Sequence, residues 1–289
     1  RTLGNYTVNI AEAGFASIRQ VSSGEIMHSH TPPMEEAKSL YVDQSALAER
    51  LQLPAGKSPE EVPELVIWDV GLGAAANAMA AVQCYEAAAA QGPVRRLKLI
   101  SFENDLDSLR LALTHKSYFP YLRHSGPDAV LARGQWTSRQ FPGLSWELLE
   151  GDFWERAPQA SAKPDLVFYD FFSHKTDTAC WKLASFARLF ELVRSERSAE
   201  LFTYSASTAV RAGLLHAGFF VGAGVGTGVK KDTTVALTSG WAGAPRHALL
   251  GAEWLGKWDR SQAKFPDGLT EPERTAFEAH IRSHPQFAG

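Results

Sequence analysis

The chain has 289 residues with 45% hydrophobic and 21% charged residues, and its formal net charge is −3. A chain of this length can bury a large core, and this composition is that of an ordinary globular protein. The balance of charge excludes an overall basic character, so any face that binds RNA has to be a local patch. The two cysteines, Cys84 and Cys180, belong to no CxxC motif or Cys/His cluster. We therefore expect two reduced thiols in a cytoplasmic protein without a signal peptide or membrane span.

The first sixty residues do not follow an alternating strand and helix pattern. Thr7–Ile10 and Ser17–Gln20 are short β-like segments that predict a hairpin. Residues 27–42 combine a proline break with an amphipathic stretch that is expected to fold over a cleft. Residues 54–63 contain Gly, Ser and Pro and have the character of a linker. We expect residues 1–60 to form an N-terminal extension.

The stretch Leu65–Ala81, LVIWDVGLGAAANAMAA, predicts a buried strand, a tight turn and a helix. Asp69 lies at the end of the strand, and Gly71 and Gly73 allow the backbone to turn sharply and to approach a cofactor closely. No Gly-Lys-Ser/Thr follows the turn, which excludes a P-loop. Asp69 and Asn77 interrupt the apolar run, which argues against a transmembrane helix. Chemistry is therefore expected at the carboxyl edge of a parallel sheet.

Acidic residues follow the next three predicted strands as well. These strands and acids are Leu97–Phe102 with Glu103, Trp146–Leu149 with Asp152, and Asp165–Tyr169 with Asp170. A carboxylate after the second strand suits the ribose hydroxyls of an adenosine cofactor, and one after the third suits the adenine amino group. The pattern favours a class I methyltransferase that uses S-adenosylmethionine (SAM) over a nicotinamide-dependent dehydrogenase. Asp69, Gly71, Gly73, Glu103, Asp152 and Asp170 are the predicted cofactor-binding residues.

The fold class follows from this order of elements. Phe219–Val225 and Thr233–Leu237 predict a terminal antiparallel hairpin. We expect an α/β, Rossmann-like class I methyltransferase with a mostly parallel seven-stranded sheet over residues 61–239. Residues 104–145 are long for one helix and a connection, and either contact substrate or pack as an insertion. Residues 240–289, with Trp241, Trp254, Trp258 and a helix start near Glu271, form a C-terminal extension that wraps the core.

The loop after the fourth strand faces the position where a methyl group would leave SAM. Asp170 is the predicted catalytic residue, because a carboxylate there would accept or orient the proton of an amine nucleophile. It would otherwise cap a helix or anchor the loop. Phe172 would stack on a base or pack beneath the loop, and Lys175 would meet a phosphate, the cofactor edge or only solvent. His28 and His30 have no third ligand nearby, so no metal site is expected.

Two further pairs of charged residues are candidates for substrate binding. Glu35 and Glu36 lie in the stretch expected to cover the cleft, where a carboxylate would hold a cationic amine; a solvated helix face is the alternative. Lys230 and Lys231 lie in the turn of the terminal hairpin, where they would contact phosphate or keep an edge soluble.

Several motifs together resemble one family, the methyltransferase domain of the bacterial tRNA 5-methylaminomethyl-2-thiouridine biosynthesis enzyme. The resemblance runs from about Gly24 to about Leu237. Its motifs are Glu35-Glu36 with Tyr41-Val42, the WDVGLG turn, Asp170 with Phe172, Ser173, Lys175 and Trp181, Thr203-Tyr204-Ser205-Ala206, Val210-Arg211, Gly213-Leu214 and Ala217-Gly218-Phe219. The later motifs are the more specific ones, because generic methyltransferases do not share them.

The resemblance implies a SAM-dependent N-methyltransferase that acts on the aminomethyl group of a modified wobble uridine in tRNA. It implies that Asp170 lies at the amine, that Glu35 or Glu36 shapes the substrate pocket, and that basic residues near Lys230 meet RNA. Bifunctional members carry an oxidase domain, so a separate oxidase acting upstream in the same pathway is a further expected partner. We do not expect this chain to bind a membrane. Phe171 stands where the family usually has glycine or proline, and His174 stands where it usually has proline. An acceptor that is a small molecule or a protein therefore stays open, as does a non-catalytic SAM-binding module.

Overall fold

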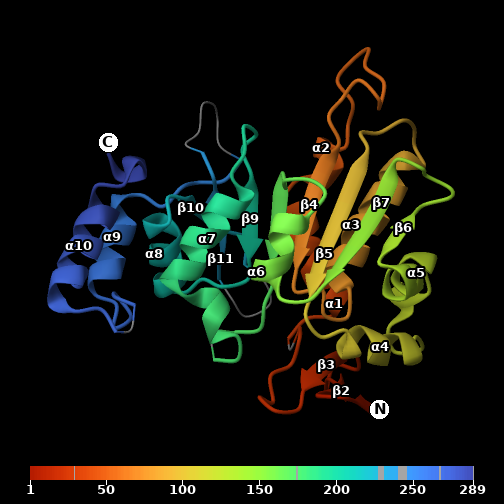
Figure 1. Ribbon diagram of the computed structural model, residues 1–289, viewed down its shortest axis with the longest axis horizontal. Coiled ribbons are helices and arrows are strands. Elements are labelled where there is room, and N and C mark those ends of the chain that lie inside the picture. Colours follow the sequence, from red (N-terminus) through yellow and green to blue (C-terminus); the bar gives the residue numbers. More distant parts are fainter. Residues whose placement is uncertain (29, 174, 227–230, 240–245, 267, 289) are drawn as a thin grey trace.

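The computed structural model describes residues 1–289 except 29, 174, 227–230, 240–245, 267 and 289. Its centre is an eight-stranded sheet with helices on both faces, as Figure 1 shows. The strands of this sheet are β4 (Leu65–Val70), β5 (Leu97–Glu103), β6 (Gln135–Thr137), β7 (Leu144–Glu150), β8 (Leu166–Tyr169), β9 (Glu200–Thr203), β10 (Phe220–Gly224) and β11 (Thr233–Leu237). Their spatial order is β10-β11-β9-β8-β4-β5-β7-β6.

The pairing of the strands explains where a ligand site can form. β4 pairs in parallel with β5 on one side and with β8 on the other, and β7 and β9 extend the parallel part. The chain thus leaves β4 in one direction and later returns to its other side. Such a reversal of strand order opens a crevice at the carboxyl ends of the strands. The glycine turn after β4 lies at this crevice.

The predicted terminal hairpin is confirmed, with β10 and β11 antiparallel and β11 antiparallel to β9. The expected number of seven strands is corrected to eight, because β6 adds an antiparallel edge strand next to β7. β6 lies inside the long segment 104–145, and its central residue Trp136 is buried against the ring of His124 at a centroid distance of 5.1 Å. A strand of three residues is too short to be recognised by its pattern.

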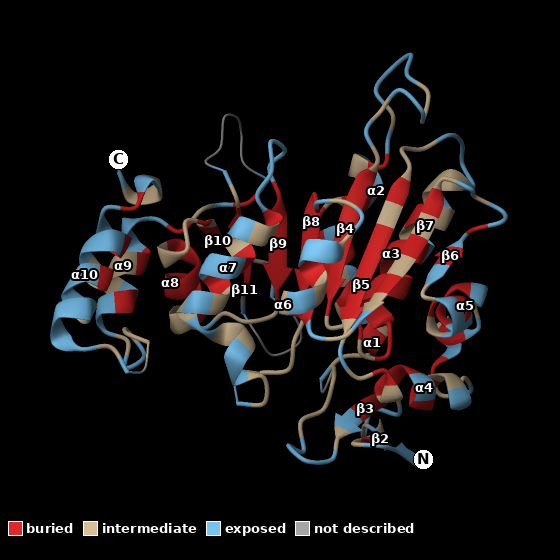
Figure 2. Cartoon of the chain, viewed as in Figure 1, coloured by how far each residue is buried: buried red, intermediate tan, exposed pale blue. Residues whose placement is uncertain are grey.

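Alternating side chains of β4 pack into two separate hydrophobic cores, one on each face of the sheet. Leu65 and Ile67 pack on the face covered by α1, α3, α4 and α5, whereas Val66 and Trp68 pack on the face covered by α6, α7 and α8. The helices of the first face are α1 (Pro33–Ala37), α2 (Leu47–Arg50), α3 (Ala76–Ala89), α4 (Asp107–Thr114) and α5 (Ser125–Arg133). Those on the second side are α6 (Phe153–Arg156), α7 (Leu183–Val193), α8 (Thr208–His216), α9 (Ala252–Asp259) and α10 (Glu271–Arg282). Figure 2 shows the strands of the sheet buried and the outward faces of α7 and α10 exposed.

The N-terminal residues form a small sheet of β1 (Thr2–Leu3), β2 (Tyr6–Ile10) and β3 (Ala16–Gln20). The predicted hairpin is confirmed, since β2 and β3 pair antiparallel from Tyr6 with Gln20 to Ile10 with Ala16. Figure 1 shows β2 and β3 beyond the carboxyl ends of the parallel strands, beside α4. The segment that follows leads to α1 and to a π-helical stretch, Lys38–Asp43, in which Tyr41 is buried.

The C-terminal residues pack beyond β10, with α10 beside α8 (Figure 1). α10 starts at Glu271, as predicted, and Thr270 and Glu273 close a capping box at its first turn. Trp254 and Trp258 are buried with stacked rings, so these two tryptophans anchor the segment to the core. Trp241 lies outside the described residues.

Candidate active site

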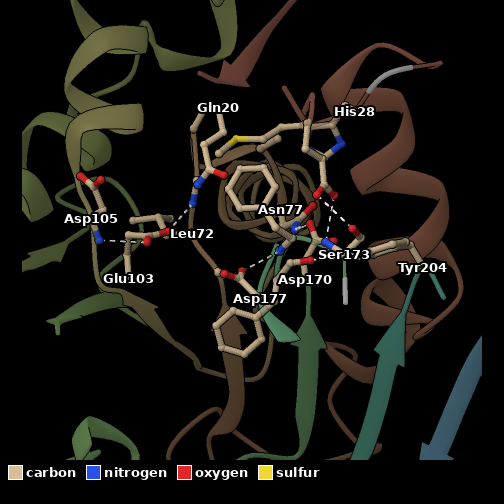
Figure 3. Close-up of a pocket in the computed structure, with 18 of the residues that line it drawn as sticks. Gln20, His28, Leu72, Asn77, Glu103, Asp105, Asp170, Ser173, Asp177 and Tyr204 are labelled. Carbon is tan, nitrogen blue, oxygen red and sulfur yellow. Dashed lines mark hydrogen bonds between the residues drawn. The ribbon is translucent and has the colours of Figure 1, made fainter. Parts of the chain in front are cut away.

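A cavity of about 810 Å³ lies at the carboxyl ends of β4, β5, β7 and β8. It has the size of a typical small-molecule or cofactor site. Glu103, Asp152 and Asp170 line it, together with Gly71 and Gly73 from the turn after β4. Figure 3 shows Glu103 and Asp105 on one side of the cavity and Asp170, Asn77 and His28 on the other. The structure thus brings these acids together around one space.

Gly71 holds the tightest point of the turn. Its φ is +88°, and a Cβ atom there would lie 2.7 Å from the backbone oxygen of Asp170. A residue with a side chain would be strained at this φ, and its Cβ atom would clash with the Asp170 backbone. The turn therefore lets the backbone after β4 approach the backbone after β8 directly. Gly73 also has a left-handed φ, of +52°, with the sulfur of Met27 close to its free side.

Glu103 links the turn to the end of β5. Its Oε2 accepts a hydrogen bond from Gly73 N at 2.9 Å, and its Oε1 accepts from the backbone N–H groups of Asn104 and Asp105. Burial raises the pKa of Glu103 to about 6, although these hydrogen bonds oppose the shift. Each oxygen retains lone-pair capacity for a hydroxyl that enters the cavity.

Asp69 does not line the cavity, which corrects its predicted place beside the cofactor. Its side chain is buried within the sheet, where Asp69 Oδ2 accepts a hydrogen bond from Ser101 Oγ at 2.7 Å. Ser101 in turn accepts one from Trp146 Nε1 at 2.9 Å. Burial raises the pKa of Asp69 to about 8. A strand-end position does not decide which face a side chain occupies, and here the alternation of β4 directs Asp69 inward.

Asp152 lines the cavity and also begins α6. Its Oδ1 accepts hydrogen bonds from the backbone N–H groups of Trp154 and Glu155, at 2.8 and 3.3 Å. It therefore caps a short helix, as Asp at such a position often does. Phe153 and Trp154 line the same part of the cavity.

Asp170 follows β8 and is surrounded by polar side chains from several elements. Its Oδ2 accepts a hydrogen bond from Asn77 Nδ2 at 2.7 Å. Burial raises the pKa of Asp170, and the nearby His28 and the hydrogen bond from Asn77 oppose this rise. Tyr41 OH lies buried close by and makes no hydrogen bond of normal geometry among the described residues. Its pKa is raised well above the ordinary value, first by burial and then by the charge of Asp170.

The segment after β3 contributes the residues on the other side of Asp170. His28 Nδ1 lies 2.9 Å from Glu36 Oε2, and both residues line the cavity. Glu35 is exposed and does not line it, so of the two predicted carboxylates only Glu36 reaches the site. His28, Tyr41 and Asn77 were not predicted as site residues. The chain spacing of His28 and Glu36 gave no signal, because their pairing depends on the turn before α1.

Glu25 connects this N-terminal segment to the loop after β8. Its Oε1 accepts a hydrogen bond from Ser173 N at 2.8 Å, and its Oε2 accepts from Ser173 Oγ and Thr176 Oγ1 at 3.0 and 2.6 Å. Three hydrogen bonds to one carboxylate hold the two segments together across 148 residues of chain. The N-terminal segment is thus part of the cavity wall.

The remaining predicted substrate residues lie at different distances from the cavity. Phe172 lines it, and its backbone N–H donates to Asp177 Oδ2 at 3.1 Å. Lys175 and Lys231 are exposed and do not line it, whereas Lys230 lies outside the described residues. The cysteines Cys84 and Cys180 are free, as expected, and Cys180 lines the cavity.

The described lining of the cavity is strongly acidic. It contains seven carboxylates and neither Lys nor Arg. The carboxylates are those of Glu25, Glu36, Glu103, Asp105, Asp152, Asp170 and Asp177. Among the described residues, no group of three or more His, Cys, Asp or Glu side chains has an arrangement that would hold a metal ion. Such a site suits ligands that carry positive charge.

The residues present fit an adenosine cofactor with a sulfonium centre. Gly71 and Gly73 bring the backbone of the turn into the cavity lining, and Glu103 offers acceptors for ribose hydroxyls. Asn77 Oδ1 is buried at the cavity without a hydrogen-bond partner in the described structure. An unpaired buried acceptor is costly unless a ligand donates to it. The surrounding carboxylates stabilise a positive charge.

Comparison with known proteins defines the class of this chain. Residues 132–239 match a family model described as S-adenosyl-L-methionine-dependent methyltransferase. Together with the fold and the cavity, this match assigns the chain to the SAM-dependent methyltransferases, with a Rossmann-like class I fold and SAM as cofactor. No helix among the described residues is long and apolar enough to span a membrane.

The relatives define the type more closely. The chain is 29% identical over 250 residues to the tRNA 5-methylaminomethyl-2-thiouridine biosynthesis bifunctional protein MnmC of Chromobacterium violaceum, covering 81% of this chain and 34% of that protein. It is 30% identical over 246 residues to the protein of the same name from Pseudomonas aeruginosa strain UCBPP-PA14, covering 81% and 35%. The chain thus carries a methyltransferase domain of the MnmC type and spans about a third of the length of these relatives.

A solved structure supports the fold across almost the whole chain. The crystal structure of MNMC2 from Aquifex aeolicus superposes with a TM-score of 0.66 and 21% identity, covering 97% of this chain and 85% of that one. At this identity the likeness concerns the fold.

Proposed function

We propose that this chain transfers the methyl group of SAM to the aminomethyl group of a modified wobble uridine in tRNA. The relatives that bear the MnmC name support the tRNA acceptor. The observation that carries the proposal is Asp170, whose carboxylate faces a cavity with seven acidic residues and neither Lys nor Arg in its described lining. A primary amine, which is cationic at neutral pH, is the acceptor that such a wall attracts.

We assign the cofactor to the side of the cavity formed by Gly71, Gly73, Glu103 and Asp152. Glu103 would accept hydrogen bonds from the ribose hydroxyls, because it lies at the end of β5 with its oxygens held by backbone N–H groups. Asp152 would lie near the adenine, beside Phe153 and Trp154. Asp69 supports this wall from inside the sheet through Ser101.

Asp170, Glu36 and Phe172 are assigned to the acceptor. SAM, when bound, supplies an electrophilic methyl carbon on a positively charged sulfur. Asp170 would bind the acceptor nitrogen and align its lone pair with that carbon, and Asn77 holds the carboxylate in place at 2.7 Å. Alignment of this kind lowers the barrier by removing the entropy cost of the encounter. The acidic wall would also favour the cationic form of the amine until the proton leaves.

The wider contact with tRNA is assigned to basic residues outside the cavity. Lys175 and Lys231 are exposed, and Lys230, which lies outside the described residues, is assigned to this contact on the sequence alone. We also propose that residues 61–239 form the methyltransferase domain, with residues 1–60 and 240–289 as extensions. An oxidase that acts upstream in the same pathway and a cytoplasmic location complete this proposal.

Methyl transfer to tRNA tests the function directly. The protein is incubated with SAM labelled in its methyl group and bulk tRNA from a bacterial strain that lacks this methylation. We expect label in tRNA, and after digestion in one modified uridine. Replacing that tRNA with tRNA from the parent strain is the matched control and should give much less label. Label that appears only in a small-molecule or protein fraction would overturn the tRNA acceptor.

The dependence on salt supplies a second test. Binding of tRNA through phosphate contacts weakens steeply as salt rises, because counterions are released on binding. We therefore expect the KM for tRNA to rise with salt while SAM affinity changes little. A KM independent of salt would argue against phosphate contacts through Lys175, Lys230 and Lys231.

A further inference from the structure

His28 occupies an unusual position in the wall of the cavity. Its backbone has a left-handed φ of +53°, which is uncommon for residues other than glycine. Its side chain is only 15% exposed and lines the cavity together with Asp170. Figure 3 shows the His28 ring on the same side of the cavity as Asp170, Asn77 and Ser173. Backbone conformations of this kind often persist where a side chain has a functional place.

Glu36 fixes the orientation and tautomer of the imidazole. The carboxylate Oε2 lies 2.9 Å from His28 Nδ1, and a carboxylate can only accept a hydrogen bond. The proton of a neutral ring therefore sits on Nδ1, which leaves the lone pair on Nε2. No hydrogen bond to Nε2 is present within the described part of the chain. A carboxylate that orients a histidine in this way also stabilises the charged ring.

Building on the proposed methyl transfer to an amine, we propose that His28, held by Glu36, accepts the proton that the acceptor ammonium must lose. The ammonium N–H bond breaks and its proton passes to His28 Nε2, which frees the nitrogen lone pair. That lone pair forms the new N–C bond to the methyl group as the C–S bond breaks, and the bonding electrons stay on sulfur. The proton later leaves His28 for solvent.

The charges around His28 suit it to this step. Burial lowers the pKa of His28, but the hydrogen bond and charge of Glu36 and the charge of Asp170 outweigh it, so the pKa lies above its ordinary value. An imidazole has a higher ordinary pKa than a carboxylate, so it is the better proton acceptor for an amine. Glu36 and Asp170 are the groups whose charges act on His28, and Glu25, His30, Tyr41 and Tyr204 also line the cavity.

The pH dependence of methyl transfer to tRNA distinguishes this role from a structural one. In the wild type we expect kcat/KM to fall on the acidic side as His28 becomes protonated. Glu36→Gln removes the charge that raises the pKa of His28, so its acidic limb should move to lower pH. His28→Gln should lose that limb and lower kcat by about 10²-fold or more. Glu35→Gln, whose side chain is exposed, is the matched control and should keep the wild-type limb.

The same acidic limb in Glu36→Gln as in the wild type would overturn the inference, as would its survival in His28→Gln. Calorimetric titration with SAM checks that each variant retains its fold. A second measurement is independent of the acceptor: an NMR titration of the His28 ring, in which Glu36→Gln should show a lower pKa. An unchanged His28 pKa would overturn the inference, whereas a wild type inactive on tRNA would overturn the proposed function instead.

Discussion

The side-chain amide of Asn77 donates a hydrogen bond of 2.7 Å to Asp170 Oδ2. Asn77 lies in the first turn of α3, directly after the glycine turn, and Asp170 follows β8. This contact joins the cofactor side of the cavity to the proposed acceptor side. It also leaves Asn77 Oδ1 without a partner in the described structure, available to a donor on a bound ligand.

Asp170→Asn should separate catalysis from cofactor binding. The substitution keeps the size of the side chain but removes the charge that would hold the acceptor. We expect methyl transfer to fall by about 10² to 10⁴-fold, the range for a directly acting group. SAM affinity, measured by calorimetry, should change by a few-fold at most. Asp128→Asn, on the exposed face of α5, is the control. Loss of SAM binding together with activity would make Asp170 a structural residue.

Gly71→Ala should damage the cofactor site by a steric mechanism. The new Cβ would meet the Asp170 backbone oxygen at 2.7 Å, and the φ of +88° would be strained. Gly14 has the same φ of +88° with nothing within 4 Å of a new Cβ, so Gly14→Ala measures the strain alone. That strain costs about 1–2 kcal/mol. We expect both variants to lose this amount of unfolding free energy in urea, and Gly71→Ala to lose more and to bind SAM poorly. Equal effects would contradict the close approach.

Glu103 should make SAM binding depend on pH. Its pKa is about 6 in the free protein, and the ionised form is the better acceptor for ribose hydroxyls. The affinity for SAM should therefore fall below pH 6, approaching about tenfold per pH unit. Glu103→Gln should weaken binding about 10 to 100-fold and flatten this dependence. The control is Glu150→Gln, because Glu150 is exposed and pairs with Glu103 on the neighbouring strand β7. An unaltered pH dependence in Glu103→Gln would assign the titration to another group.

The unfolding free energy of the protein should fall as the pH rises, because of the raised pKa of Asp69. Burial raises its pKa from 3.8 to about 8, so between these values the folded protein holds a proton that the unfolded chain has lost. The unfolding free energy contributed by this group is greatest below pH 4 and is lost progressively up to about pH 8, by about 1.4 kcal/mol per pH unit.

Asp69→Asn should remove this slope. Urea unfolding from pH 5 to 8.5 would show the wild type losing stability relative to the variant as the pH rises. Asp128→Asn, as an exposed control, should follow the wild type. Parallel curves for the wild type and Asp69→Asn would mean that Asp69 is already ionised in the folded protein.

The strands, the glycine turn and the terminal hairpin were predictable because each depends on local pattern. Leu65–Val70 is a continuous apolar run before two glycines, and Thr233–Leu237 is a short apolar segment after a turn. The strand at Gln135–Thr137 was missed, because three residues with only Trp136 buried carry no periodic signal. Glu103, Asp152 and Asp170 were predicted to lie together because the carboxyl ends of parallel strands meet at one edge, and all three line the cavity.

Asp69 shows the limit of that argument, because strand alternation rather than position along the strand sets the face on which a side chain lies. Lys175 and Glu35 show it as well. Both lie within a few residues of cavity-lining residues along the chain, but their side chains are exposed in the structure. The partners of the site, His28 with Glu36 and Glu25 with Ser173, depend on how the N-terminal segment packs over the sheet.

The amino-acid sequence by itself determined the class I fold, the glycine turn after the first parallel strand and the acidic strand ends. These features rest on hydrophobic periodicity and on the restricted backbone conformations of the turn, which act within a few residues. The tertiary structure alone decided which side chains face the cavity. Glu25 meets Ser173 across 148 residues and Asn77 meets Asp170 across 93, and no local pattern fixes contacts between segments so far apart.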